Sequence, residues 1–220
     1  MTMKEKPSEW VSISDLMAGV MAVVMLLLVV SVLQNQFAEL KRQEEKNQRA
    51  VTEQEKVTGL LQEMKAALDE QGDTGLVSFD LAGNKMTLGD KMFARGSACL
   101  TEEAQRQLRL VSPRIARFFE SSSQAQVLVE GHTDNVQVSR PVTDFAKFCT
   151  VYDDNFTLSA ARAREARKLL IEVLEAGQAK RVIVAGYGDS QPLPNVDPAD
   201  EHNRRVEVQF INRAEVKTRG

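Results

Sequence analysis

The hydrophobic pattern of the chain begins with a long apolar segment. Eighteen consecutive positions, residues 16–33, carry no charged side chain, and eleven of them are Leu or Val. About twenty apolar residues in a helix cross the ~30 Å hydrocarbon core of a bilayer. The run is longer than the apolar part of a cleaved signal peptide, and no small-residue cleavage site follows it. We therefore predict a retained transmembrane helix over residues 10–33, preceded by a cytoplasmic tail over residues 1–9.

A polar, proline-free segment follows the apolar one, over residues 34–72. Up to residue 70 it is rich in Glu, Gln, Lys, Arg and Ala, with Gly59 as the only helix-weakening residue of that stretch. Near its end, apolar residues recur every three or four positions, which is the spacing of one helix face: Val57, Leu60, Leu61, Met64 and Leu68. We predict a helical stalk in which this stripe forms a weak dimer seam. A single solvated helix is the alternative.

The pattern changes at the turn-forming residues 71–75 and then alternates between short strand-like and longer helix-like segments. Strands are expected over residues 76–81, 85–88, 126–130, 181–185 and 205–211, and helices over residues 102–120, capped by Thr101, and 158–176. This order predicts an α+β sandwich with helices on one face of a mixed sheet. The predicted domain spans residues 73–213, and residues 214–220 form a tail.

Composition narrows the functional classes. The 220 residues are 43% hydrophobic and 27% charged, which leaves room for one small domain with extensions. The net charge of −3 argues against a dedicated nucleic-acid binder, so no nucleic-acid partner is expected. The two histidines, His132 and His202, lack metal-ligand spacing, and Ser159 has no recognisable triad partner. We expect no enzymatic activity, no cofactor and no metal.

One carboxylate, Asp15, stands at the leading edge of the apolar run. On a helix it shares a face with Ala18, Gly19 and Ala22, and this small-residue spacing lets another backbone approach closely. An acid on the protein-facing side of a membrane helix is typical of an ion-binding site. An acid at the start of a helix can also be a boundary residue that reaches into the headgroups, so both interpretations stay open from this stretch alone.

Trp10, Asp15 and the small and apolar residues 16–21 together resemble the transmembrane signature of the MotB family of ion-driven stator subunits. In that family the aspartate carries the translocated proton or sodium ion. The resemblance therefore implies that Asp15 is the ion-translocation residue, and of the two ions we favour the proton. It also implies a homodimer that works inside a pentameric ring of a multi-pass, MotA- or ZorA-like membrane subunit.

Four motifs in the C-terminal half resemble the OmpA-like peptidoglycan-binding domain, over roughly residues 76–212. They are Val-Glu-Gly-His-Thr-Asp at 129–134, Asn-x-x-Leu-Ser-x-x-Arg-Ala at 155–163, Gly-Tyr-Gly at 186–188 with Pro192, and Asn-Arg-Arg-Val-Glu at 203–207. In that family the Asp of the first motif and the Arg of the second hold the diaminopimelate of the cell-wall peptide. The resemblance implies Asp134 and Arg162 as this pair, with Asn155, Thr133 and Arg204 as secondary candidates.

The chemistry of these side chains agrees with such a ligand. Diaminopimelate offers an ammonium and a carboxylate on one small centre, which suit an aspartate and the fork of an arginine. A structural salt bridge or a turn cap is the alternative role for Asp134 and Arg162. The motif glycines, Gly131, Gly186 and Gly188, are expected to serve tight turns, because no phosphate-loop lysine pattern accompanies them.

Two cysteines, Cys99 and Cys149, fall in the part expected outside the membrane, where an oxidising periplasm permits a disulfide. We predict that they are bonded, and two free buried thiols are the alternative. The bond would tie the segment over residues 135–154 to the start of the first domain helix. That segment is longer than in simple OmpA-like domains. Its aromatic residues predict an ordered loop that could narrow the ligand groove or form a partner surface.

Together the resemblances imply a MotB-like, single-pass subunit of a proton-driven motor in the bacterial inner membrane. Its N-terminus is expected in the cytoplasm and its domain in the periplasm, bound to peptidoglycan. Two machines are candidates: the flagellum, and the Zorya anti-phage systems, in which ZorB subunits pair the same kind of anchor with an OmpA-like domain. The stalk and the Ser-Asp-Leu-Met-Ala sequence at 14–18 favour the second. The opposing class is a passive OmpA-like cell-wall tether without ion transport.

Overall fold

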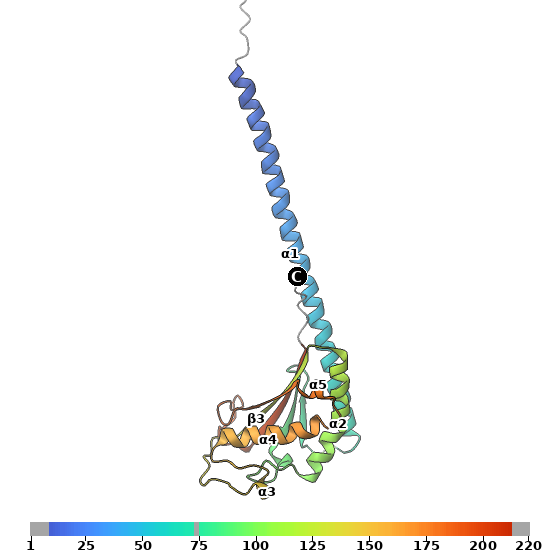
Figure 1. Ribbon diagram of the computed structural model, residues 1–220, viewed down its shortest axis with the longest axis vertical. Coiled ribbons are helices and arrows are strands. Elements are labelled where there is room, and N and C mark those ends of the chain that lie inside the picture. Colours follow the sequence, from blue (N-terminus) through green and yellow to red (C-terminus); the bar gives the residue numbers. More distant parts are fainter. Residues whose placement is uncertain (1–8, 73–74, 213–220) are drawn as a thin grey trace, which may run out of the picture. The chain divides into compact units, whose positions relative to one another are not determined.

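The computed structural model describes residues 9–72 and 75–212 (Figure 1). The chain divides into two units, Met1–Ala50 and Val51–Gly220, and each is described by itself. The predicted C-terminal tail lies outside the described residues, as does the predicted N-terminal tail apart from Glu9.

In the first unit the described residues belong to one element, helix α1 (Glu9–Asp69), which continues into the second unit. The large apolar side chains of residues 13–33 are 43–71% exposed. Among the described residues, this is the one helix long and apolar enough to cross a membrane, with a mean hydropathy of 2.9 over its best 18-residue window. A continuous apolar surface of this length is suited to lipid or to another protein rather than to water.

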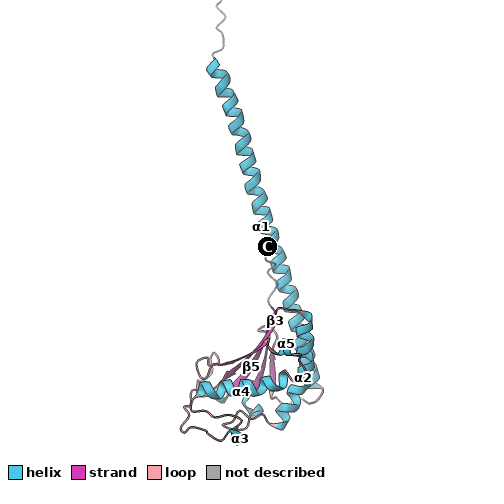
Figure 2. Ribbon diagram, viewed as in Figure 1, coloured by secondary structure: helices cyan, strands magenta, loops and turns pink. Residues whose placement is uncertain are grey.

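The described part of the second unit is built around a sheet that lies beside helices (Figure 2). The strand order of this sheet is β1-β2-β5-β3-β4. Its strands are β1 (Val77–Asp80), β2 (Lys85–Gly89), β3 (Ala125–His132), β4 (Val182–Gly186) and β5 (Arg205–Asn212). Strands β3 and β4 are parallel, and the other neighbouring pairs are antiparallel. The remaining elements are η1 (Asp90–Met92), α2 (Glu102–Ser121), α3 (Phe145–Phe148), α4 (Asn155–Leu170), α5 (Ala176–Ala179) and η2 (Glu201–Asn203).

The core of this unit lies between the sheet and its helices. Alternate residues of a strand share a face, and Val129 of β3 is paired in register with Val208 of β5. Both are fully buried, in one cluster with apolar side chains of α2 and α4 such as Ile115 and Ala166. The mixed sheet packed with helices confirms the predicted α+β class.

The apolar stripe of the predicted stalk has a different role from the one expected. Its five residues, Val57, Leu60, Leu61, Met64 and Leu68, are buried in the core of the second unit. The dimer seam predicted for them is therefore wrong, since side chains that pack inside their own domain are not available to a second copy. Gln54 and Asn84 exchange two side-chain hydrogen bonds of 2.8 and 2.9 Å, which attach the same part of α1 beside β2. The compact unit that contains the sheet therefore includes this part of α1 and begins at Val51.

The ends of the domain helices follow their caps. Thr101 caps α2 as predicted, since its side chain accepts a hydrogen bond from the backbone nitrogen of Ala104 at 3.2 Å. Helix α4 begins three residues before the prediction because Asp154 caps it, accepting from the Thr157 nitrogen at 2.6 Å. It ends at Leu170, before the predicted residue 176, and α5 then forms a separate turn behind its own Glu175–Gln178 capping box.

The long segment over residues 135–154 is attached to the rest of the domain by a disulfide between Cys99 and Cys149. A backbone hydrogen bond from Ala98 to the Phe148 carbonyl adds to this attachment, and Val142 pairs with Tyr152 within the segment itself. The Tyr152 hydroxyl also donates to the Gly96 carbonyl at 2.6 Å. The segment is therefore ordered, and it contains helix α3.

Removing the disulfide with the double change Cys99→Ser and Cys149→Ser is expected to destabilise the domain by about 2–4 kcal/mol. The bond closes a loop with a sequence separation of 50 residues, and the unfolded chain regains that freedom when the bond is absent. Thermal unfolding of the full chain, with and without reductant, measures the effect. Reductant should lower the melting temperature of the wild type and leave the variant unchanged. A reductant effect of equal size in both would contradict the prediction.

Candidate functional site

Asp134 and Thr133 lie just after β3, where the chain leaves the sheet. The Thr133 nitrogen donates to the Gly188 carbonyl at 2.8 Å, and the Asp134 carboxylate accepts from the Val136 nitrogen at 3.2 Å. Asn155, the first residue of α4, donates from Nδ2 to the carbonyls of Asp134 and Val136 at 3.2 and 3.1 Å. Asn155 therefore fixes the backbone that carries the Asp134 carboxylate. The Thr133 hydroxyl is buried without a hydrogen-bond partner among the described residues.

Arg162 reaches the same region from α4, and it is 3% exposed. Its Nε donates to the Ser97 carbonyl at 3.0 Å, and its Nη1 lies 3.3 Å from Oδ1 of Asp90. The guanidinium also stands over the Phe93 ring, 5.2 Å from its centroid. Burial lowers the pKa of Arg162, and the Asp90 carboxylate opposes that effect. The Arg162 cation is thus held inside the protein by a carbonyl, a carboxylate and an aromatic face.

Arg204 connects Asp134 to Arg162. It contacts Asp134 directly and reaches Arg162 through the carboxylate of Asp90. It donates from Nη1 to Asp134 at 2.7 Å, and its Nε and Nη2 contact the two oxygens of Asp90 at 3.0 and 3.2 Å. These hydrogen bonds raise the pKa of Arg204, and the largest contribution comes from those to Asp90. Asp134, Arg204, Asp90 and Arg162 therefore form a line of alternating charges, called the ion-pair chain below. Asp134 and Arg162 are its two ends.

The structure brings together all five residues that the sequence proposed for the cell-wall ligand and adds Asp90, which sequence reasoning missed. Asp90 directly follows β2, so a carboxylate at a strand end was visible in the pattern. Nothing local indicated that this strand end lies beside Arg162 and Arg204, which are 72 and 114 residues away in the chain. A cavity of about 430 Å³ opens beside the ion-pair chain, with Asp90, Arg204 and Glu207 among its lining residues.

Two motif glycines position α4, which carries Arg162. A Cβ at Gly131 would stand 2.0 Å from the Ser159 carbonyl oxygen, and one at Gly186 would stand 2.6 Å from the Ala160 side chain. Both glycines are therefore required for the close approach of α4 to β3 and β4. This role differs from the tight turns expected of them from the sequence. Gly188 does occupy a turn, with φ at +54°, and its nitrogen donates to the Ser159 hydroxyl at 2.9 Å.

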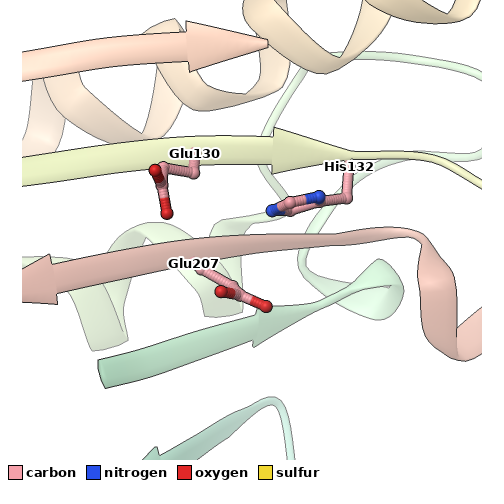
Figure 3. Close-up of side chains that lie close together, drawn as sticks. All are labelled: Glu130, His132 and Glu207. Atoms are coloured by element: carbon pink, nitrogen blue, oxygen red, sulfur yellow. The ribbon is translucent and has the colours of Figure 1, made fainter. Parts of the chain in front are cut away.

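A second polar cluster lies on the sheet itself, and Figure 3 shows its three members: Glu130 and His132 of β3 and Glu207 of β5. His132 is 2% exposed, and its ring stacks on Tyr187 with centroids 5.3 Å apart. The pKa of His132 is lowered to about 4. Burial of the ring is the largest cause, and the nearby charge of Arg205 is the second. These three residues are the group in the described chain that could hold a metal ion, and their spacing in the sequence gave no such signal.

Asp15 belongs to the first unit, where it is an exposed residue of α1. Gly19, one turn further on, has nothing within 4 Å of the position that a Cβ would take, so this face of the helix is open to a neighbour. The geometry of the helix is compatible with close packing of a neighbour against Asp15.

The fold and the motifs define the class of protein, and the chain belongs to the OmpA family, whose sequence profile matches residues 92–205. Among individual proteins, it is similar to the Zorya protein ZorB of Escherichia coli, with 24% identity over 98% of this chain and 93% of that protein. Recognition of an OmpA-like, MotB-like chain from its motifs is thereby confirmed.

The chain is also similar to solved structures, two of which follow. A putative MotB-like protein from Desulfovibrio vulgaris superposes with a TM-score of 0.54 and 24% identity, over 73% of this chain and 96% of that one. The periplasmic domain of Helicobacter pylori MotB gives a TM-score of 0.44 and 19% identity, over 59% of this chain and 76% of that one. The first of these supports the same sheet-and-helix architecture for the second unit.

Proposed function

We propose that this protein is a MotB-like, single-pass subunit of a proton-driven motor in the bacterial inner membrane. In this proposal α1 anchors the chain in the membrane, Asp15 carries the proton, and the OmpA-family domain holds peptidoglycan in the periplasm. The observation that carries the proposal is the combination, in one chain, of an acid at the edge of an exposed apolar helix with an OmpA-family domain.

The cell-wall half of the proposal rests on the two ends of the ion-pair chain. Asp134 and Arg162 do not pair with one another, because Arg204 and Asp90 stand between them. A ligand with an ammonium and a carboxylate on one centre can therefore bind Asp134 through its ammonium and an arginine through its carboxylate at the same time. Diaminopimelate has that chemistry, and Arg204, at 29% side-chain exposure, is accessible enough to exchange partners when it enters.

The membrane half rests on α1. Its large apolar side chains are exposed from Ile13 to Leu33, so lipid and partner helices have to cover them. The face of Asp15 also carries Ala18, Gly19 and Ala22, which suit close packing against a multi-pass partner in the manner of MotA or ZorA. In such a contact the carboxylate would take up a proton from one side and release it to the other. Each cycle would move the partner while the peptidoglycan-bound domain stays fixed.

Similarity to ZorB over 98% of the chain supports an anti-phage role for the motor. A flagellar stator subunit remains the second candidate, because the fold of the domain is also that of a MotB-like protein. A passive cell-wall tether would share the domain and the anchor, and it would have no use for the Asp15 carboxylate.

The experiment is Asp15→Asn in the native operon, scored for phage protection and for motility at checked protein level and membrane insertion. Asn is nearly isosteric with Asp but cannot exchange a proton, so we expect complete loss of one of the two phenotypes, which also names the machine. Asp69→Asn is the matched control, since Asp69 lies on the same helix beyond the apolar run and pairs with Lys65 at 2.8 Å. Full activity of Asp15→Asn in both assays would leave the tether as the function.

A further inference from the structure

The polar face of the sheet carries three metal-ligating side chains at adjoining positions. Glu130 and Glu207 are direct cross-strand partners in the antiparallel β3–β5 ladder. His132 is two residues beyond Glu130 on the same strand and therefore on the same face. One ligating atom from each residue lies within 4.8 Å of the other two. Figure 3 shows the three side chains gathered on this face, with one ring nitrogen of His132 directed toward Glu130.

The histidine of this cluster has no partner of its own. His132 is 2% exposed, and neither ring nitrogen has a hydrogen-bond partner within the described ranges 9–72 and 75–212. A buried imidazole without hydrogen bonds is unfavourable, because its ring nitrogens have lost water and gained no partner. Tyr187 stacks on the ring and contacts its face rather than its nitrogens. An unpaired and buried imidazole lone pair is what a metal ion would bind.

The carboxylates are only partly compensated. Glu130 is 9% exposed and makes no ion pair with any side chain that the structure describes; the Tyr187 hydroxyl donates to it at 3.2 Å. Glu207 is paired with Arg205 at 2.7 Å and with Lys85 at 2.8 Å. Two buried carboxylates face one another, and one of them lacks a cation of its own. A positive charge between them would relieve their mutual repulsion.

We propose that Glu130, His132 and Glu207 form a binding site for a divalent cation, with zinc as the ion that fits best. Imidazole and carboxylate ligands hold zinc at about 2.0–2.2 Å, which sets ligand atoms ~3.4 Å apart in a tetrahedron. Donors already within 4.8 Å of one another reach that geometry by small side-chain rotations. Glu207 also lines the 430 Å³ cavity, so one of the three ligands is reached from it.

The bound ion would connect β3 to β5 on the polar face of the sheet. Because β3 leads directly into Thr133 and Asp134, the ion would stiffen the end of β3 that precedes these two residues. Lys85, whose side chain is 33% exposed, would give up its place on Glu207 to the ion. This proposal is independent of the motor role, because it concerns metal binding by the domain whatever the chain drives.

The experiment measures zinc binding to the full chain in detergent after removal of metals with a chelator. Isothermal titration with zinc chloride should give one ion per chain in the wild type. Glu130→Gln and His132→Gln should each weaken the affinity at least tenfold, because each removes one of three ligands. Lys85→Gln should strengthen it several-fold, because it removes one of the two cations that compete for Glu207.

His202→Ala is the matched control. His202 is the other histidine of the chain, it is exposed, and its Nδ1 lies 2.6 Å from Asp200, so it is the competing place for a surface-bound ion. The proposal requires unchanged affinity in His202→Ala. Absence of zinc binding in the wild type, loss of binding in His202→Ala, or unchanged affinity in both Glu130→Gln and Lys85→Gln would each overturn it. If His132→Gln does not fold, the affinities of Glu130→Gln and Lys85→Gln decide the outcome.

Discussion

Replacing Gly131 by alanine is expected to destabilise the domain by about 3 kcal/mol. The added Cβ would stand 2.0 Å from the carbonyl oxygen of Ser159 and 2.6 Å from its carbonyl carbon, both of which belong to the backbone of α4. A backbone atom cannot rotate away, so β3 and α4 have to separate. Because α4 carries Asn155 and Arg162, the same displacement should open the candidate site. Thermal unfolding of the full chain measures the loss.

Gly59→Ala is the matched control for this prediction. Gly59 lies inside α1, and a Cβ there would meet nothing within 4 Å. The same substitution should therefore stabilise the helix by about 0.5–1 kcal/mol, since alanine favours helical backbone more than glycine does. Opposite signs for the two variants would assign the effect of Gly131→Ala to its contact with Ser159. A loss below 1 kcal/mol for Gly131→Ala would contradict the close packing of β3 on α4.

Replacing Arg162 by glutamine is expected to lower the affinity for a diaminopimelate-containing cell-wall peptide by at least about 30-fold. Truncating one partner of a buried charged contact costs roughly 2–5 kcal/mol, and 2 kcal/mol corresponds to about that factor. Glutamine also loses the forked guanidinium that matches a carboxylate. Titration of the purified peptide into the full chain in detergent measures the change. Asp134→Asn should give a loss of similar size, because it removes the partner of the ligand ammonium.

Lys168→Gln serves as the control, since it removes a positive charge from the same helix at an exposed position paired with Glu165. Its affinity should stay within twofold of the wild type. Arg162→Lys should fall between the wild type and Arg162→Gln, because the charge is kept and the fork is lost. Unchanged affinity in a folded Arg162→Gln protein would mean that Arg162 is structural. Its role would then be to hold the Ser97 carbonyl and Asp90, the contacts it makes at 3.0 and 3.3 Å.

Local patterns in the sequence determined most of the elements of this protein. The apolar run of α1, the alternation in β2 and β5, and the Thr101 cap of α2 each depend on residues close together in the chain. They could therefore be predicted from periodicity and capping. The same holds for the motifs around Asp134 and Arg162, whose residue types and spacing indicated the family before any geometry was known.

Only the tertiary structure decided what those elements contact. The stripe from Val57 to Leu68 has the spacing of a helix face, and that spacing is the same whether the face packs on a second copy or on its own domain. Asp90 lies beside Arg204, and Glu207 lies near His132, because strand pairing brings together residues that are distant in the sequence. The physical reason is that periodicity records which side of an element is buried. The partner on that side is set by the packing of the whole domain, which no local stretch contains.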